Sequence, residues 1–391
     1  MRISAIHELA VPLAGGVANA LVSFDEHDVS LVAVVSDVIR NGRPLVGYGF
    51  DSIGRFAQSG ILRQRMVPRV MQAARDRPAS LLSEDETRFD AAQVLRVALR
   101  NEKPGGHGDR AAAAAALELA IWDLNAKLAD EPAWATIARQ AGRRGKTDGI
   151  EVYAAGGYYY PDDSLDRLTR EFEGYRVLGY DAFKMKIGGA TLHEDMKRIE
   201  AALGVAGSGA RLAVDANGRF DLDQALRYGE AIAQYGLRWF EEAGDPLDYE
   251  LNRQLTQAYA GRVATGENLF SSLDVRNLVR HGGMRAGLDV FQMDPGLSYG
   301  LSEYMRMLDV MQSAGFDRAQ AHPHGGHLIN LHIAAGLELG GCEAYPGVFQ
   351  PFGGYPLACG VGGGKVRPTD APGFGLEQKD ALRPWLERLS A

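Results

Sequence analysis

Cysteine is scarce in this chain, because its 391 residues include only Cys342 and Cys359. Two cysteines late in a chain cannot form a disulfide framework or a thiolate metal site. Long apolar runs are also missing, so no segment reaches the length needed to cross a bilayer. At the N-terminus, His7, Glu8 and Pro12 interrupt any signal-peptide core, and we interpret the segment as a first strand and a loop. These absences predict a cytoplasmic protein.

The chain also has no dense run of basic residues. Its 42 Lys and Arg are outnumbered by 50 Asp and Glu, for a net charge of -8, which argues against a nucleic-acid partner. An anionic small molecule stays open, because local cations or a bound metal can reverse the field inside one pocket. With 46% hydrophobic and 24% charged residues the composition is that of a globular protein. The length predicts two domains or one α/β barrel with an added domain.

The Gly-x-Gly-x-x-Gly pattern of dinucleotide-binding sheets is missing after the first strand. From residue 150 onward, short apolar runs instead alternate with amphipathic helical stretches such as 164–179, 192–203 and 222–236. Strands alternating with helices imply a parallel sheet, and eight such units match a (β/α)₈ TIM-type barrel over residues 150–350. The eight expected strands are 151–157, 181–187, 211–217, 237–243, 262–268, 288–294, 317–324 and 342–347.

Residues 1–130 follow a different pattern, which predicts a separate α+β domain. The segment 355–391, rich in Gly and Pro before a short helical stretch, is expected to return to that domain. Within 1–130 we expect strands near 30–39 and 44–50 and helices near 61–75, 88–100 and 110–130, the last of them Ala-rich and packed against the barrel.

Polar residues recur where successive barrel strands are expected to end. Their separations of 29, 26, 26, 27 and 30 residues match the length of one βα unit. Barrel enzymes carry their active sites at this carboxyl end, so the groups should converge on one mouth. They are Lys186, Asp215, Glu241, Glu267, Asp294 and His324.

Three consecutive strands in this series contribute the carboxylates Asp215, Glu241 and Glu267. Such a cluster repels itself unless a cation neutralises it, whereas isolated carboxylates usually cap helices or pair with arginine. Oxygen ligands on a rigid scaffold favour Mg²⁺, one ion per site, with Mn²⁺ as a chemically reasonable alternative. The even spacing makes separate structural roles a poor explanation.

The stretch "FKMK" places Lys184 and Lys186 on one face of the second strand and Phe183 and Met185 on the other. Repulsion between the two ammonium groups and partial burial should lower the pKa of at least one lysine. A lysine with a lowered pKa can act as a general base near neutral pH.

The segment "AHPHGGH" supplies an acid from the seventh strand, across the mouth from the lysines. We favour His324 for this role, partly on the family resemblance given below, with Asp294 accepting from its ring to fix the tautomer and support the protonated form. His322 and His327 compete for the role, and His322 shares a strand face with His324.

These residues and their surroundings resemble the enolase superfamily, specifically its mandelate racemase-like branch. The matching strings are "FKMKIGG", "AVDANG", "WFEEA", "ATGEN", "QMDPGLSYG" and "HPHGGH". Members of that superfamily use a Lys or His base with Mg²⁺ to stabilise an ene-diolate. The resemblance implies a modified, enolase-like barrel with residues 1–130 as a capping domain. Within the branch, "NEKPGGHGDR", "YAAGGYYYP", "GDPLDY" and "FQPFGG" are most similar to the D-tartrate dehydratase group.

The resemblance also implies residue roles. Asp215, Glu241 and Glu267 would bind Mg²⁺, Lys186 would be the base, and His324 with Asp294 the opposing acid. Lys184, Asn217 and Glu343 would contact the substrate. The implied reaction is dehydration of a hydroxy dicarboxylic or sugar acid, such as D-tartrate to oxaloacetate. A homo-oligomer is expected from the resemblance alone.

The sequence differs from the family pattern at two places, and two other functions stay open. The fourth strand continues as "EEAGDP" where many relatives have Glu-Glu-Pro, and the capping loops carry apolar Leu21 and Ile53 where a tartrate-specific protein would be more polar. A racemase or epimerase would use the same Lys and His pair, with the histidine returning a proton to the same carbon. A non-catalytic acid-binding relative is the third alternative.

Two further residues are candidates for substrate binding. Lys103 precedes the Gly-rich "PGGHG", a loop that could close over the mouth and bring a cation to a distal carboxylate, although an exposed loop lysine is an equally simple interpretation. Asn19 could bond the substrate from the capping domain, although asparagine is also common in turns for local reasons.

Overall fold

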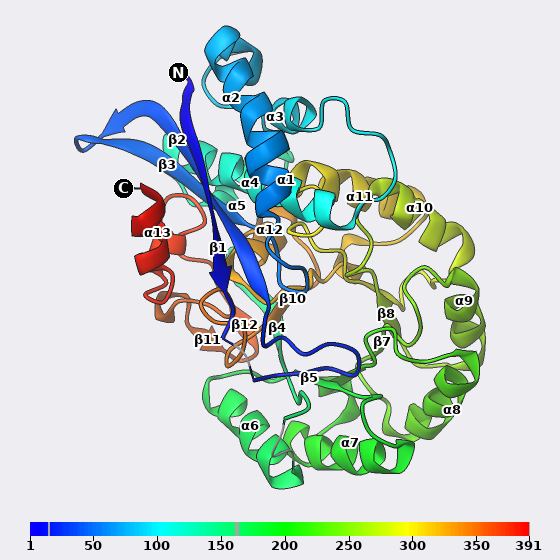
Figure 1. Ribbon diagram of the computed structural model, residues 1–391. Helices are drawn as coiled ribbons and strands as arrows, with labels where there is room; N and C mark the ends of the chain where they lie inside the picture. The colour runs from blue at the N-terminus through cyan, green and yellow to red at the C-terminus, as the bar shows by residue number, and fades with distance from the viewer. Residues whose placement is uncertain (15, 161–163, 391) are drawn as a thin grey trace.

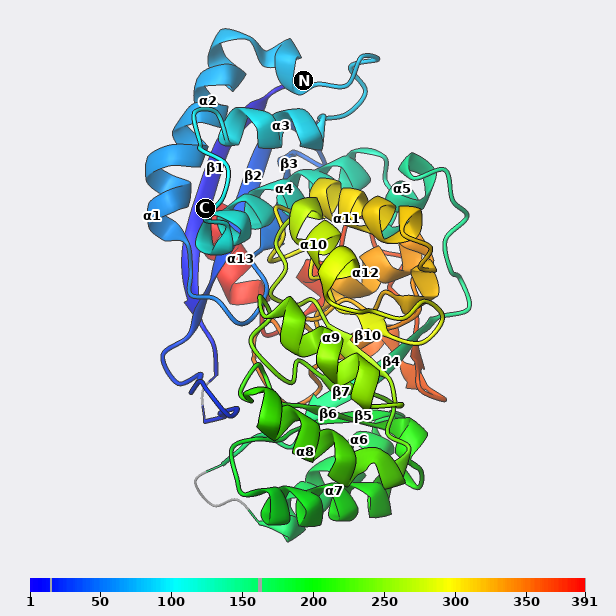
Figure 2. The same cartoon turned by 90° about the vertical axis from the view of Figure 1, so that its right-hand side faces the viewer.

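The computed structural model describes residues 1–14, 16–160 and 164–390. It combines a parallel barrel with an antiparallel sheet that carries its own helices beside the barrel mouth (Figure 1). Figure 2 shows this sheet along one flank, with the barrel helices α7 and α8 at the far end of the molecule. The predicted fold class, a barrel with an N-terminal α+β capping domain, is confirmed by this arrangement. Within the described ranges, no helix is both long and apolar enough to cross a membrane.

The capping sheet consists of β1 (Ile3–Pro12), β2 (Asp28–Arg40) and β3 (Arg43–Phe50) in sequential antiparallel order. Only Asn41 and Gly42 connect β2 to β3, and both have positive φ, at 51° and 76°. Two-residue hairpin turns need such conformations, which Asn-Gly adopts readily. The apolar run of β2 is buried on both faces, and α4 (Gly108–Leu128) and α13 (Arg383–Ser390) both contact this strand.

One long helix, α4 (Gly108–Leu128), lies between the capping sheet and the barrel. It packs against β2 and β3 on one side and against α11 on the other, and residues 111–127 are buried almost without exception. Gly49 of β3 makes the close approach possible, because a Cβ there would lie 2.4 Å from the backbone nitrogen of Ala120. The other capping helices are α1 (Ser59–Ile61), α2 (Val67–Asp76) and α3 (Ala91–Ala98), with a π-helical turn, Leu62–Met66, between α1 and α2. The next helix, α5 (Ala133–Gln140), packs mainly against the barrel helix α12 (Leu328–Leu337).

The barrel strands run parallel, and β10 pairs with β4 to close the circle. In chain order they are β4 (Ile150–Gly156), β5 (Phe183–Lys186), β6 (Leu212–Asp215), β7 (Phe240–Glu241), β8 (Val263–Thr265), β9 (Val290–Phe291) and β10 (Cys342–Ala344).

The predicted strand 317–324 is wrong over most of its length. A 3-10 turn, Arg318–Gln320, occupies its first half, and only Ala321 forms a bridge to Phe291 of β9. The turn is stabilised by a capping box from Asp317, and Pro323 has no N–H to continue a ladder. Backbone bonds from His322 N to Phe291 O (2.8 Å) and from Glu343 N to Pro323 O (3.2 Å) still place this segment between β9 and β10.

Most of the helices that surround the barrel begin with a side-chain N-cap that accepts from a backbone N–H of the first turn. The N-cap residues are Ser164, Asp221, Asp248, Ser271, His327 and Thr191, the last of which forms a capping box with Glu194. The helices are α6 (Leu165–Val177), α7 (Leu192–Ala206), α8 (Leu222–Ile232), α9 (Tyr249–Ala258), α10 (Ser272–His281), α11 (Leu301–Ser313) and α12 (Leu328–Leu337).

The segment after residue 355 contacts both parts of the molecule. The hairpin of β11 (Val361–Gly362) and β12 (Lys365–Val366) adds antiparallel to the start of β4. Further on, α13 (Arg383–Ser390) packs against β1 and β2 of the capping sheet.

Candidate active site

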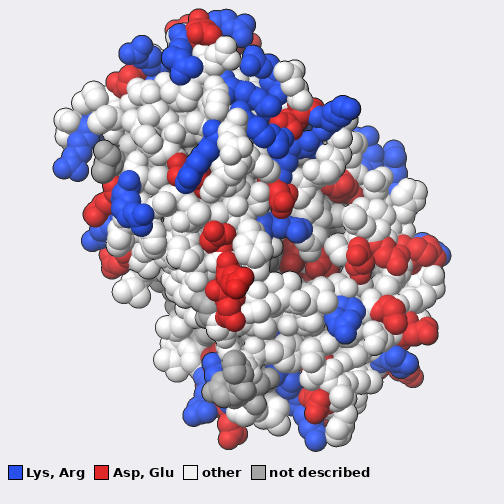
Figure 3. All heavy atoms as spheres, viewed as in Figure 1, with Lys and Arg blue, Asp and Glu red and all other residues white. Residues whose placement is uncertain are grey.

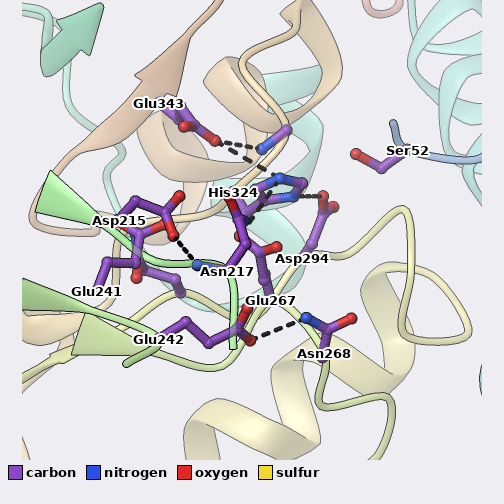
Figure 4. Close-up of polar contacts among 12 residues, drawn as sticks. Ser52, Asp215, Asn217, Glu241, Glu242, Glu267, Asn268, Asp294, His324 and Glu343 are labelled. Atoms are coloured by element: carbon purple, nitrogen blue, oxygen red, sulfur yellow. Dashed lines mark hydrogen bonds and ion pairs between the residues drawn. The ribbon is translucent and has the colours of Figure 1, made fainter. Parts of the chain in front are cut away.

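The polar residues predicted at the strand ends lie together at the barrel mouth. Lys186, Asp215 and Glu241 are the last residues of β5, β6 and β7, and all three are buried. Glu267 follows β8 by two residues, and Asp294 follows β9 by three. Parallel strands bring their carboxyl ends to one rim. In Figure 4 the side chains of Asp215, Glu241 and Glu267 gather in front of His324.

Asp215, Glu241 and Glu267 form a cluster that could hold a metal ion. One carboxylate oxygen from each lies within 4.8 Å of the others. Burial, and then the charge of Asp215, raise the pKa of Glu241 to about 8, and Oε2 of Glu267 is buried without a hydrogen-bond partner in the described structure. An all-oxygen donor set that repels itself and leaves one oxygen unsatisfied suits a hard divalent cation.

Both lysines of β5 contact this cluster. Nζ of Lys186 lies 2.6 Å from Oδ2 of Asp215, and Nζ of Lys184 lies 2.5 Å from Oε1 of Glu241. Lys184 also reaches Oε1 of Glu343 at 2.7 Å. Burial alone would lower the pKa of Lys184, as expected for at least one of the two lysines, but the surrounding carboxylates outweigh burial and raise the pKa of this one. Lys184 therefore stays charged, as a group that holds negative oxygens.

His324 approaches the cluster from the opposite side. Its Nδ1 lies 3.0 Å from Oδ2 of Asp294, its Nε2 lies 3.0 Å from the Tyr345 hydroxyl, and Oε2 of Glu267 is 3.6 Å from Nε2. Burial favours the neutral ring, but the carboxylates of Glu267, Glu343 and Asp294 outweigh it and raise the pKa of His324 to about 10. The imidazolium is thus stabilised, as a general acid requires.

The two competing histidines are placed differently. His322 is buried against the Trp239 ring, with centroids 5.7 Å apart, and burial lowers its pKa to about 3. Nε2 of His327 lies 3.1 Å from the Ser52 hydroxyl, and burial lowers its pKa to about 4. Of the three, His324 is the one that lines the central cavity. The geometry therefore favours His324 as the general acid.

This central cavity measures about 290 Å³ and lies between the barrel mouth and the capping domain. Figure 3 shows the corresponding hollow near the middle of one face, with acidic and basic side chains around it. The barrel contributes polar groups and the capping loops contribute mostly apolar ones, including Leu21 and Ile53. The residues that line this cavity include Arg55, Tyr158, Lys186, Glu267, Asn268, His324 and Tyr345.

The predicted substrate-binding residues differ in where they lie. Asn217 lines the cavity, donates its backbone N–H to Oδ1 of Asp215 at 2.9 Å, and has a buried Oδ1 with no partner among the described residues. Glu343 lies behind the lining, paired with Lys184 and accepting from Gly325 N at 3.0 Å. The structure brings both to the metal cluster.

Asn19 and Lys103 lie farther from the chemistry. Asn19 lines the cavity, but its Oδ1 accepts from the backbone N–H groups of Leu21 and Val22, both at 2.8 Å, so it has the local turn role. Lys103 is exposed and lines a separate pocket beside Tyr299. The structure does not bring Lys103 to the central cavity.

The sequence reasoning missed Tyr345, Tyr158 and Arg55. Tyr345 was detectable, because it follows Glu343 by two residues on the eighth strand and must face the same side. Tyr158 lies beyond the first strand, its ring 5.2 Å from Nζ of Lys186. Arg55 lies in the capping loop "DSIGRF", where no strand periodicity fixes direction.

Comparison with known proteins identifies the family. Residues 167–382, more than half of the chain, match the family model described as "Enolase C-terminal domain-like". The chain belongs to the enolase superfamily, in its mandelate racemase-like branch. The prediction made from the strand-end motifs is therefore confirmed.

Several members of the enolase superfamily resemble the chain along most of its length. The L-talarate/galactarate dehydratase of Salmonella typhimurium is 26% identical over 379 residues, which cover 96% of this chain and 88% of that one. The arabinonate dehydratase of Saccharolobus solfataricus is 26% identical over 326 residues, 82% and 80% of the two chains. A racemase from Streptomyces coelicolor, solved with bound magnesium, superposes with a TM-score of 0.77 at 22% identity and 99% coverage of each chain.

Proposed function

We propose that this enolase-superfamily member is a Mg²⁺-dependent dehydratase of hydroxy dicarboxylic or sugar acids, and that D-tartrate is a candidate substrate. One observation carries the proposal. Lys186 contacts Asp215, the first carboxylate of the cluster, and His324 lies 3.6 Å from Glu267, the third. The predicted base and the histidine whose protonated form is stabilised thus flank one carboxylate cluster and line one cavity. Two relatives that align with most of the chain are named as acid sugar dehydratases.

The cofactor in this proposal is Mg²⁺, held by Asp215, Glu241 and Glu267. Bound there, it would stabilise the negative charge that builds on a substrate carboxylate when the neighbouring C–H bond breaks. The fit is supported by the oxygen-only donors, their separation of at most 4.8 Å and the unsatisfied Oε2 of Glu267. Lys184, held between Glu241 and Glu343, would add a positive charge beside the substrate carboxylate.

The protein's own groups move the two protons. The Lys186 amine takes the α-proton, and the electrons of the C–H bond pass into the substrate as an ene-diolate. His324, charged and oriented by Asp294, then donates from Nε2 to the β-hydroxyl. The C–O bond breaks, water leaves, and the remaining enol ketonises to a 2-keto acid. For tartrate the product is oxaloacetate.

A racemase or epimerase is the second candidate, and the same geometry supports it. If the substrate places its α-carbon rather than its β-hydroxyl against Nε2 of His324, the histidine returns a proton to that carbon on the other face. The facing pair of Lys186 and His324 serves either outcome. The orientation of the bound acid decides between them.

The test is proton NMR in D₂O with Mg²⁺ and a panel of acids: the tartrate stereoisomers, galactarate, L-talarate and arabinonate. We expect one acid to lose its α-proton signal and yield a keto acid. Exchange of the α-proton without keto acid would support the racemase instead. An intact signal with every acid in the panel would contradict an acting Lys186 and His324 pair for this substrate class and support a non-catalytic acid-binding protein.

A further inference from the structure

Arg55 is a cation of the capping loop that lines the central cavity, as Lys186 does from the barrel. We propose that Arg55 binds a second carboxylate of the substrate, so that the protein selects dicarboxylic over monocarboxylic acids. The proposal rests on the proposed function in that the first carboxylate is taken to bind at the metal cluster. It gives the distal-carboxylate role to Arg55 instead of Lys103, which lines another pocket.

Two barrel residues hold the Arg55 guanidinium in place. Nη2 donates to Oδ1 of Asn268 at 2.9 Å, and the group lies over the Phe270 ring, 5.1 Å from its centroid. Asn268 directly follows Glu267 and donates its amide to Oε1 of Glu242 at 2.9 Å. The guanidinium is therefore held by the residue that follows the third carboxylate of the cluster, on the wall of the same cavity.

The hydrogen-bonding capacity of Arg55 is mostly unused. A guanidinium has five N–H donors, and the described structure gives Arg55 one hydrogen bond, to a neutral amide, and no ion pair. Arg285 shows the contrast, since it donates to both oxygens of Asp289 and to the carbonyls of Thr256, Tyr259 and Gly261. A half-buried guanidinium with free donors facing a cavity is suited to bidentate binding of a carboxylate.

The other capping residues around the cavity carry no full charge. His27 is stacked on Phe56, with ring centroids 4.2 Å apart, and burial lowers its pKa, so it stays neutral near pH 7. Arg55 thus supplies the positive charge on this wall, among lining residues that are otherwise neutral: Asn19, Leu21, Val22, Phe24, His27, Ile53 and Gly54. An anion reaching the capping side would have Arg55 as its charged partner, whereas a neutral sugar end would leave the guanidinium unpaired.

A purely structural role is the competing explanation. Arg55 could tie the capping loop to the loop that carries Asn268 and Phe270 without touching the substrate. In that case its loss would weaken the binding of all acids equally, because the loop would shift for every ligand. A carboxylate-binding role predicts a loss confined to the second carboxylate.

The experiment compares succinate with succinamate by calorimetry on the full chain with saturating Mg²⁺. Both ligands share the four-carbon skeleton of tartrate, lack hydroxyls and differ in one carboxylate, so no turnover interferes. We expect wild type to bind succinate about tenfold or more tightly than succinamate. Arg55→Gln should abolish this preference, Arg55→Lys should restore part of it, and Lys103→Gln, which alters an exposed lysine of the other pocket, should leave it unchanged.

Two results would overturn the proposal. One is equal binding of succinate and succinamate by wild type, a measurement that needs no variant to fold. The other is an Arg55→Gln protein that keeps the preference or loses affinity for both ligands to the same extent, which would assign Arg55 the structural role. A succinate preference that depends on Arg55, in a protein that exchanges no α-proton, would contradict only the proposed dehydration.

Discussion

Buried carboxylates occur in two regions of this molecule with opposite surroundings. On α4, Glu118 accepts from the indole of Trp122, from the hydroxyl and N–H of Ser302 and from the N–H of Leu301, at 2.5 to 3.0 Å. At the barrel mouth, three carboxylates crowd one another, and Oε2 of Glu267 has no hydrogen-bond partner among described residues. Both regions bury carboxylates, but Glu118 is satisfied by neutral donors, whereas at the mouth Asp215 and Glu241 pair with the lysines of β5 and Oε2 of Glu267 has no hydrogen bond.

This difference in hydrogen-bond partners distinguishes a structural carboxylate from one that can bind a ligand. Glu118 joins α4 to the start of α11, where Gly300 offers no side-chain cap. A Cβ at Gly300 would lie 2.2 Å from Oε2 of Glu118, so only glycine allows this contact. The backbone there is shaped around the carboxylate. At the mouth, the chain instead leaves space and unsatisfied oxygens, which costs stability unless a cation completes the set.

Lys186→Ala should have the largest effect of the variants at the barrel mouth. Removing a general base typically lowers the rate about 10²- to 10⁴-fold, and we expect kcat for keto-acid formation to fall within that range. The circular dichroism spectrum should change little. Lys103→Ala is the matched control, with kcat kept within about twofold. A Lys186→Ala protein that keeps its activity would show that Lys186 is not the general base.

Glu267→Gln probes the metal cluster directly. Residues that merely support metal ligands change affinity about 10- to 100-fold when mutated, so loss of a ligand charge should weaken Mg²⁺ binding by about 100-fold in calorimetry. The metal-free protein should be no less stable to urea than wild type, because the substitution removes a repelling charge. A clear loss of metal-free stability would mean that Glu267 is a structural carboxylate like Glu118.

Glu118→Gln should give the reverse pattern. The amide NH₂ would face N–H donors that the carboxylate now satisfies, and we expect a loss of about 2–3 kcal/mol in the free energy of unfolding, measured with urea. Mg²⁺ affinity should be unchanged, since α4 contributes nothing to the cluster. If Glu118→Gln instead weakened Mg²⁺ binding without changing stability, the comparison drawn above would be wrong.

The smallest predicted effect is a pH dependence of stability that comes from a buried histidine outside the carboxylate cluster. His332 on α12 is fully buried, and burial lowers its pKa to about 3. Because the unfolded chain binds a proton below the usual value near 6.5, stability present above pH 6.5 is lost as the pH falls toward 3. At pH 5 this histidine alone should cost about 2 kcal/mol. Urea unfolding at pH 7 and pH 5 should therefore show a smaller decline for His332→Gln than for wild type; equal declines would contradict it.

The sequence predicted the barrel well because its signal is local and repeated. The spacing of Lys186, Asp215, Glu241 and Glu267 reflects the fixed length of a βα unit, and parallel strands leave little choice about where their ends meet. The seventh strand failed because Pro323 and the Asp317 capping box favour a turn over a ladder. Packing between β9 and β10 nevertheless places that segment in the barrel.

Predictions that depended on the capping domain were less successful. Lys103 and Arg55 both lie on loops, and which of them reaches the cavity depends on how two domains dock, a relation that spacing does not encode. The raised pKa of Lys184 could not be predicted from spacing, because Glu343, distant in sequence, joins Glu241 around the ammonium. The domain boundaries, the catalytic roles, the cytoplasmic location and the homo-oligomer stay predictions.

The contact of α13 with β1 and β2 has a consequence for how the protein is made. During synthesis the capping strands emerge first, but the helix that covers part of them is translated only after the whole barrel. The capping sheet should therefore complete its packing late, after residues 383–390 have left the ribosome. Nascent chains halted before residue 383 should leave exposed the part of β1 and β2 that α13 contacts.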